Sequence, residues 1–223
     1  MTTLSLQARQ DFLEKDAKVG DPLKGIAEFV WNALDADASD VKVELVKNDL
    51  GGISAIQIVD DGHGISRERA DHDFANLGDS IKRNLARTRT LERAVHGKEG
   101  RGRLKFFSIA RLAKWHTVYE EDGVRQALDL TIQANNLEHC EVTDPQATGA
   151  ATGTVVELVS LKEPFDRLDS TDAFREFSTI FAPYILQYPT VQISFNGFTI
   201  DPRITINKDV DIPQKPIVWN SMK

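Results

Sequence analysis

The stretch Glu28-Phe-Val-Trp-Asn32-Ala-Leu-Asp35-Ala is the part of the sequence from which the fold can be worked out. It belongs to a run, residues 26–40, that has neither proline nor glycine and carries apolar residues at helical spacing, so we predict a helix. Glu28, Asn32 and Asp35 stand at i, i+4 and i+7 and therefore share one helix face. Two carboxylates and an amide flanked by core residues indicate a binding face. A merely solvated polar face explains the helix equally well, so the helix alone leaves both interpretations open.

Composition and charge restrict the class of protein. The 223 residues, 41% of them hydrophobic, suffice for one large domain or one and a half. The sequence has no apolar run of membrane-spanning length, no signal-peptide pattern at its start and a single cysteine, Cys140, so we expect a cytoplasmic protein without a membrane partner. The five histidines lack a zinc-like spacing, and the net charge of −7 argues against nonspecific nucleic-acid binding by the bulk surface.

The remaining sequence predicts a mixture of helices and strands. Residues 41–46 and 53–59 alternate apolar and polar side chains around a glycine turn. This pattern indicates a hairpin directly after the helix that carries Glu28. Further helices are predicted at 4–18, 103–113 and about 170–184, and further strands at 114–120, 125–133, 138–143, 152–159 and 191–195. After residue 197 the pattern loosens, and we interpret residues 198–223 as a linker or the start of a further domain.

A second polar motif stands where the predicted strand 53–59 ends, in Asp60-Asp-Gly62-His-Gly64-Ile. Asp-Gly is a common turn dipeptide, so a simple turn explains it. In the functional interpretation, Asp60 accepts a hydrogen bond from an exocyclic amine, and the two glycines let the backbone approach a flat ring closely.

A basic stretch follows. Residues 82–105 contain nine Lys or Arg against two acidic residues, and they include the glycine pattern Gly97-Lys-Glu-Gly100-Arg-Gly102. A solvated surface or a flexible loop explains this composition, and so does a site for a polyanion. Glycines that open a helix can present free N–H groups to phosphates. The pattern is neither the dinucleotide fingerprint, because no core strand precedes it, nor a Walker loop, which needs Gly-Lys-Ser/Thr.

Taken in order, the motifs resemble the four nucleotide-binding motifs of the GHKL superfamily: Glu28-x3-Asn32-x2-Asp35, Asp60-x-Gly62-x-Gly64, Gly97-x2-Gly100-x-Gly102, and Gly153-Thr154 opening a strand. This superfamily comprises gyrase-type topoisomerases, ninety-kilodalton heat-shock chaperones, histidine kinases, MutL-type repair proteins and MORC-type ATPases. The resemblance covers about residues 4–197. It implies the α+β Bergerat fold, a two-layer sandwich of a mixed, mostly antiparallel sheet with helices on one face. It also implies an ATP-binding domain over residues 1–197, with a lid at about 76–102.

Glu28 and Asn32 have roles that follow from chemistry and that the resemblance also implies. Glu28 is placed to take a proton from the water that attacks the γ-phosphate, and Asn32 offers a neutral oxygen to Mg²⁺. The resemblance further implies that Asp60 reads the adenine amine and that Asp35 supports the adenine pocket through water. The other residues that it assigns to nucleotide binding are Gly62, Gly64, Asn76, Lys82, Gly97, Gly100, Gly102 and Thr154.

Two residues of these motifs are left without a predicted role. His63 has none that the resemblance requires. Arg103 departs from the aromatic or small residue that several relatives carry after the last glycine, which puts the packing of the lid in doubt.

The expected function is Mg²⁺-dependent ATP binding with slow hydrolysis. Histidine kinases normally lack an acid at the position of Glu28, so hydrolysis is favoured over phosphotransfer, and the chain is most like the MORC, MutL and chaperone branch. That branch implies an ATP-dependent homodimer that controls attached domains, which act on nucleic acid or on a client protein. The alternative is a nucleotide-gated scaffold with negligible hydrolysis.

Overall fold

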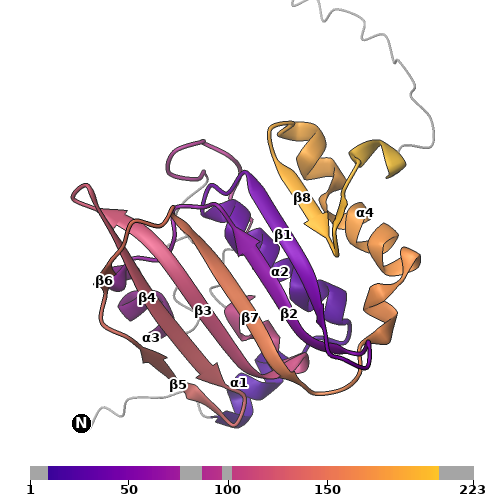
Figure 1. Ribbon diagram of the computed structural model, residues 1–223, viewed down its shortest axis with the longest axis horizontal. Helices are drawn as coiled ribbons and strands as arrows, with labels where there is room; N and C mark the ends of the chain where they lie inside the picture. The colour runs from indigo at the N-terminus through magenta and orange to yellow at the C-terminus, as the bar shows by residue number, and fades with distance from the viewer. Residues whose placement is uncertain (1–9, 76–86, 97–101, 206–223) are drawn as a thin grey trace, which may run out of the picture.

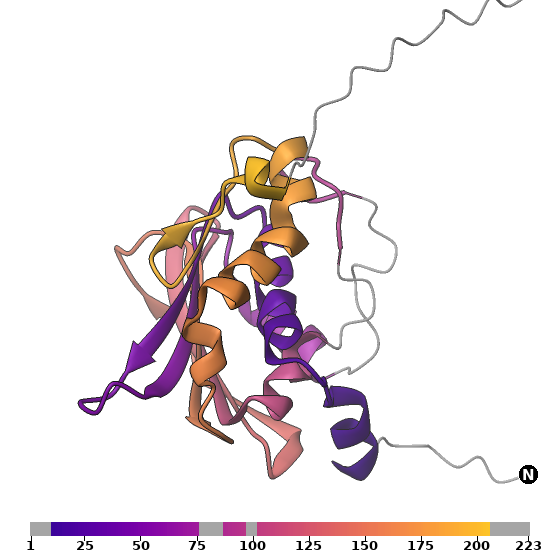
Figure 2. The ribbon, with the colours of Figure 1, turned by 90° about the vertical axis from the view of Figure 1, so that its right-hand side faces the viewer.

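The computed structural model describes residues 10–75, 87–96 and 102–205, and these form two layers. Nine strands of the described chain make one sheet, in the order β5-β4-β3-β7-β2-β1-β8-β9, with the short β6 paired to β4. Figure 2 shows this sheet nearly edge-on, with helices α1 (Gln10–Ala17), α2 (Pro22–Asp35) and α4 (Thr171–Gln187) all on one side. The expected α+β sandwich is confirmed.

Helix α2 lies at the centre of the helical layer. Asp21 caps it by accepting a hydrogen bond from the Leu23 N–H at 3.0 Å, and Pro22 fits the first turn because that position needs no donor. Its apolar stripe, which includes Ile26 and Val30, is completely buried. The helix ends at Asp35, earlier than the predicted run, because Asp37 adopts a positive φ of 62°.

The sheet is mixed. Strands β1 (Asp40–Lys47) and β2 (Ile53–Asp60) form the predicted antiparallel hairpin, and β1 pairs in parallel with β8 (Gln192–Phe195). On its other edge β2 pairs with β7 (Gly153–Leu161) in a register that sets Asp60 opposite Thr154. The sheet continues through β3 (Ala110–Glu121), β4 (Val124–Gln133), β5 (Asn136–Val142) and β6 (Gln146–Ala147).

The C-terminal part of the described chain closes the helical layer. Ser170 caps α4 by accepting from the Ala173 N–H at 3.1 Å, as its sequence predicts, and Phe177 and Phe181 are fully buried. The short helix η3 (Asp166–Asp169) precedes α4. Beyond residue 197 the sheet continues, because β9 (Phe198–Thr199) pairs with β8, and η4 (Pro202–Thr205) follows. A linker or further domain over 198–223 stays a prediction.

One helix assignment from the sequence was wrong, and one helix was missed. The predicted helix 103–113 is instead a short 3-10 helix, η2 (Gly102–Ser108), followed by the start of β3 at Ala110. Pairing with both β4 and β7 overrides the local helical spacing there. Helix α3 (Arg67–Ala75) was missed because Phe74 is its only large apolar side chain, so the sequence shows no apolar stripe at helical spacing. Of the predicted helix 4–18, the described part is α1. No helix of the described chain is both long enough and apolar enough to cross a membrane.

Candidate functional site

Glu28 and Asn32 lie one turn apart on the half-buried face of α2, and the backbone at Gly102 passes directly over them. A Cβ added at Gly102 would lie 2.9 Å from Glu28 Oε2 and 3.3 Å from the side-chain nitrogen of Asn32. Any other residue at position 102 would displace these side chains. The structure thus brings together the first motif and the last glycine of the third, which are far apart in the sequence.

The second motif meets the fourth at the end of β2. Asp60 Oδ1 accepts from the Gly62 N–H at 2.9 Å, and its register partner across the sheet is Thr154. Gly153 has a φ of 150°, and a Cβ there would lie 2.2 Å from the Asp60 carbonyl oxygen. Glycine is therefore required at 153 for β7 to approach this strand end. Burial raises the pKa of Asp60 to about 6, although the N–H groups of Gly62 and Thr154 favour its carboxylate and oppose the shift.

Gly64 and Thr154 converge on a residue that the sequence did not indicate. Gly64 has a φ of 72°, and a Cβ there would lie 2.1 Å from the Val118 carbonyl oxygen. The fully buried Thr117 of β3 accepts from the Ile65 N–H at 2.8 Å, and its Oγ1 lies 3.1 Å from Thr154 Oγ1. Thr117 therefore holds the loop after Asp60 against β7. It has no local signal in the sequence, because its contact depends on the order of strands.

The end of α2 joins these two halves of the site. The Ala36 carbonyl oxygen accepts from the His63 N–H at 2.9 Å, and it would lie 2.8 Å from a Cβ at Gly62. Burial lowers the pKa of His63, whose Nδ1 lies 2.9 Å from the Gly64 carbonyl oxygen. The described contacts of His63 are therefore structural: its backbone and its ring both hold the loop after Asp60.

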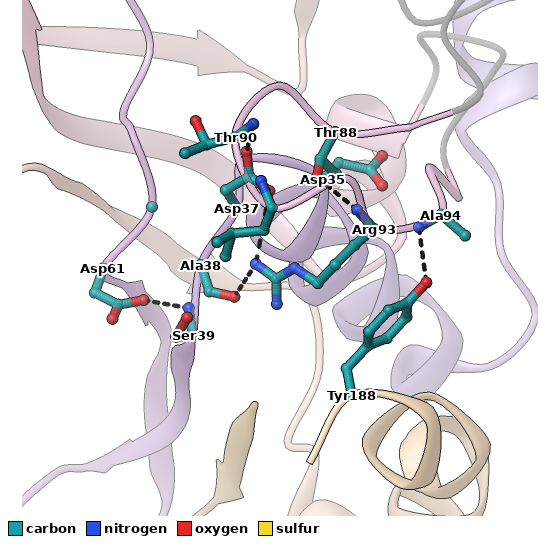
Figure 3. A network of polar contacts seen from close by, with 12 residues as sticks. Asp35, Asp37, Ala38, Ser39, Asp61, Thr88, Thr90, Arg93, Ala94 and Tyr188 are labelled. Atoms are coloured by element: carbon teal, nitrogen blue, oxygen red, sulfur yellow. Dashed lines mark hydrogen bonds and ion pairs between the residues drawn. The ribbon is translucent and has the colours of Figure 1, made fainter. Parts of the chain in front are cut away.

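The segment 87–96 docks against the end of α2 (Figure 3). The Asp37 carboxylate accepts from the Thr90 N–H at 2.8 Å and the Leu91 N–H at 3.3 Å. Arg93 is 3% exposed and donates to the Ala38 carbonyl oxygen at 2.7 Å, with Asp37 at 3.9 Å. This network holds one described part of the expected lid region against the helix that carries the first motif.

A second set of contacts ties the same segment to Asp35 and α4. The buried Asp35 accepts from the His96 N–H at 2.8 Å, and the His96 ring stacks on Trp31 at 3.9 Å between centroids. The Ala94 N–H donates to the Tyr188 hydroxyl at 3.0 Å (Figure 3). Asp35 therefore holds residue 96, a contact that was not predicted; its expected role at an adenine through water stays a prediction.

Four predicted site residues fall outside the described residues: Asn76, Lys82, Gly97 and Gly100. Arg103, the departure noted in the sequence, packs its guanidinium over the Phe74 ring at 4.9 Å from the centroid. Burial lowers its pKa, with the Asp73 charge opposing the shift. Arg103 thus connects the start of η2 to α3.

The arrangement offers the carboxylate of Glu28, the side-chain amide of Asn32 and the desolvated carboxyl of Asp60. Gly102 is half-buried and lies beside Glu28 and Asn32, and carboxylate and amide oxygens are ligand types that suit a Mg²⁺ ion. Within residues 10–75, 87–96 and 102–205, no cluster of three or more His, Cys, Asp or Glu side chains could hold a metal.

Comparisons with known proteins agree with this geometry. Residues 22–157 match the family described as histidine kinase-, DNA gyrase B-, and HSP90-like ATPase. The DNA mismatch repair protein MutL of Akkermansia muciniphila is 27% identical over 199 residues, 87% of this chain and 28% of that protein. MutL of Methanothrix thermoacetophila is 31% identical over 164 residues, 72% of this chain and 26% of that protein. The chain thus spans about a quarter of the length of these relatives.

A solved structure, the N-terminal domain of a DNA repair protein, shares the fold with a TM-score of 0.52 at 19% identity, and the match covers 83% of this chain and 51% of that one. The match to the family covers more than half of the chain and includes the elements that carry Glu28, Asp60 and Thr154. The resemblance found in the sequence is confirmed, and the chain belongs to the family of histidine kinase-, DNA gyrase B- and HSP90-like ATPases.

Proposed function

We propose that the chain binds ATP with Mg²⁺ and hydrolyses it slowly, and that the ATP-bound form pairs two copies and controls attached domains. The observation that carries this proposal is the contact of Gly102 with both Glu28 and Asn32. It joins a candidate base, a candidate metal ligand and a backbone segment on one surface. Family membership independently favours ATP over other phosphorylated ligands.

Adenine binds at the end of β2 in this proposal. The Asp60 carboxylate accepts a hydrogen bond from the exocyclic amine. It can do so because the Gly62 N–H occupies only one of its acceptor sites and others are left for the amine. Gly62 and Gly64 let the loop after Asp60 pack closely against Ala36 and Val118, which fixes the backbone at one side of the adenine. Thr117 and Thr154 hold the loop and β7 in the positions that shape this pocket.

The triphosphate lies along α2 towards Gly102. Glu28 takes the proton of the attacking water, and the absence of a side chain at Gly102 leaves room for its carboxylate. Asn32 would hold the metal through its side-chain oxygen, and a bound Mg²⁺ would supply positive charge that offsets the negative charge developing on the phosphate oxygens. The family members named as relatives are DNA mismatch repair proteins, which favours DNA over a client protein as the target of attached domains.

Calorimetric titration of ADP and of ATP into the 223-residue chain, with Mg²⁺, tests the proposal. We expect saturable binding and a slow turnover that depends on Glu28. No heat at high protein concentration would refute nucleotide binding. Binding without any Glu28-dependent turnover in the natural protein would instead support the nucleotide-gated scaffold.

A further inference from the structure

Helix α3 points its two arginines in opposite directions. Arg67 and Arg69 are two residues apart, which on a helix is a rotation of about 200°. Arg67 lies on the side of β5, where its guanidinium contacts Asp71 at 3.0 Å and the Thr143 carbonyl oxygen at 3.3 Å. Arg69 therefore faces away from β5.

The surroundings of Arg69 belong to the candidate nucleotide site. Its charge acts on His63 in the loop after Asp60, and the charges of Asp35 and Arg89 act on Arg69 in turn. Ser66 fixes the first turn of α3 by accepting from the Arg69 N–H at 3.3 Å. Helix α3 begins three residues after Gly64, so Arg69 lies close in the chain to the loop after Asp60, and its charge interacts with that of Asp35.

Local contacts do not satisfy the Arg69 side chain. Only 18% of it is exposed, and its nearest acidic partner, Asp73, lies 3.8 Å from Nη2, which is too long for a hydrogen bond. Its Nε is buried and has no hydrogen-bond partner among the described residues. A guanidinium removed from water in this way needs acceptors, because its N–H groups are costly to leave unpaired. Burial accordingly lowers its pKa.

We propose that Arg69 contacts the phosphate groups nearest the ribose with its planar guanidinium, and so makes the site prefer nucleoside diphosphates and triphosphates to nucleosides. This inference rests on the proposed function and adds a phosphate ligand from α3, outside the four motifs. Arginine suits the task because its fork of donors matches phosphate oxygens. Asp73, one turn further along α3, orients the guanidinium when the site is empty of nucleotide.

The test compares Arg69→Gln with Arg67→Gln, which removes the arginine on the opposite side of the same helix. Calorimetry measures ADP and adenosine, each with Mg²⁺ and with EDTA. We expect Arg69→Gln to weaken ADP binding about tenfold or more, since hydrogen bonds to charged groups are strong. The loss is expected to be largest in EDTA, where no metal shares the phosphate charge. Adenosine affinity, and every affinity of Arg67→Gln, should stay within about twofold.

Equal losses of ADP and adenosine would overturn the phosphate contact, and so would unchanged ADP binding by Arg69→Gln. If that variant does not fold, Arg69→Lys decides, because it keeps the charge but not the fork. A selective loss of ADP affinity of about threefold or more supports the inference, and wild-type affinity refutes it. If the wild-type chain binds no ADP, the proposed function itself is refuted. If the wild-type chain binds ADP and Arg69→Gln binds it equally well, only the role of Arg69 is refuted.

Discussion

Lowering the pH through 6 should weaken the binding of an adenine ring to this site, because Asp60 must be ionised to accept the amine hydrogen bond most strongly. Burial raises the pKa of Asp60 to about 6. An amine donor stabilises the carboxylate, so ligand binding lowers this pKa and releases a proton below pH 6. Affinity therefore falls as the pH falls. If Asp60 had to be protonated to bind, affinity would instead rise as the pH falls.

The size of the effect follows from the ionised fraction. If only the carboxylate form binds, the apparent Kd is the intrinsic Kd divided by that fraction. With a pKa of about 6, the ionised fraction is roughly 0.9 at pH 7 and roughly 0.1 at pH 5. Adenosine binding should thus weaken by about tenfold between these two values. Adenosine is the right ligand because a terminal phosphate of ADP titrates near pH 6 itself, as phosphate monoesters do.

Asp60→Asn supplies the control for this prediction. It cannot titrate, and it turns one acceptor into a donor that faces the amine, so adenosine should bind at least tenfold more weakly with no pH dependence. The folded-state pKa is raised from 3.8, so the contribution of Asp60 to the free energy of unfolding is lost as pH rises from about 4 to about 6. Asp60→Asn should therefore be at least as stable as wild type at pH 7. NMR titration measures the adenosine affinity at each pH, and thermal unfolding measures the stability of the two proteins. Wild-type affinity that stays constant from pH 7 to pH 5 would refute the assignment of Asp60.

Three other predictions concern the phosphate end and the docked segment. Glu28→Gln should leave ATP binding near normal and reduce turnover by about 10²–10⁴-fold, whereas Asn32→Ala should weaken Mg²⁺–ATP itself; the reverse pattern would invert these roles. Gly102→Ala should lower turnover by about 10²-fold, because its Cβ would displace Glu28, while Gly149→Ala, whose Cβ meets nothing within 4 Å, should not. Asp37→Ala should cost about 1–2 kcal/mol more stability than Asp37→Asn, which keeps an acceptor and tolerates positive φ. Hydrogen exchange at the Thr90 and Leu91 amides should rise in the Ala variant; equal protection in both variants would contradict the docking.

Features that depend on neighbouring residues in the chain could be predicted from the sequence. The shared face of Glu28, Asn32 and Asp35 follows from helical spacing alone, and the hairpin that ends in Asp60 follows from alternation. The first, second and fourth motifs therefore lie on the predicted elements, whereas Gly102 of the third opens a 3-10 helix and not the predicted α-helix. That the motifs meet was expected from the resemblance to the family and not from local pattern, because Gly102 reaches Glu28 only after intervening elements, among them β1, β2 and α3, have packed.

Contacts between distant segments had no local signal. Thr117 supports Ile65 because β3 lies next to β7, and the position of a strand within a sheet is set by long-range pairing. The docking of the segment 87–96 depends on Asp37, whose left-handed conformation aims its carboxylate at two amides 53 and 54 residues further on. An Asp-Ala-Asp sequence at a helix end does not indicate such a partner.

The early start of β3 at Ala110, in place of the end of the predicted helix, bears on how the proposed site would hold phosphate. A long helix beginning at 103 would have directed a full macrodipole at the nucleotide. The chain instead forms seven residues of 3-10 helix and then enters β3, where Ile109 packs against Gly25 of α2, at 2.9 Å from the position of an added Cβ. Such a short helix contributes only a few free N–H groups and a weak dipole. In the proposed function, side-chain cations then carry more of the phosphate charge, and this is the role that we propose for the under-bonded guanidinium of Arg69.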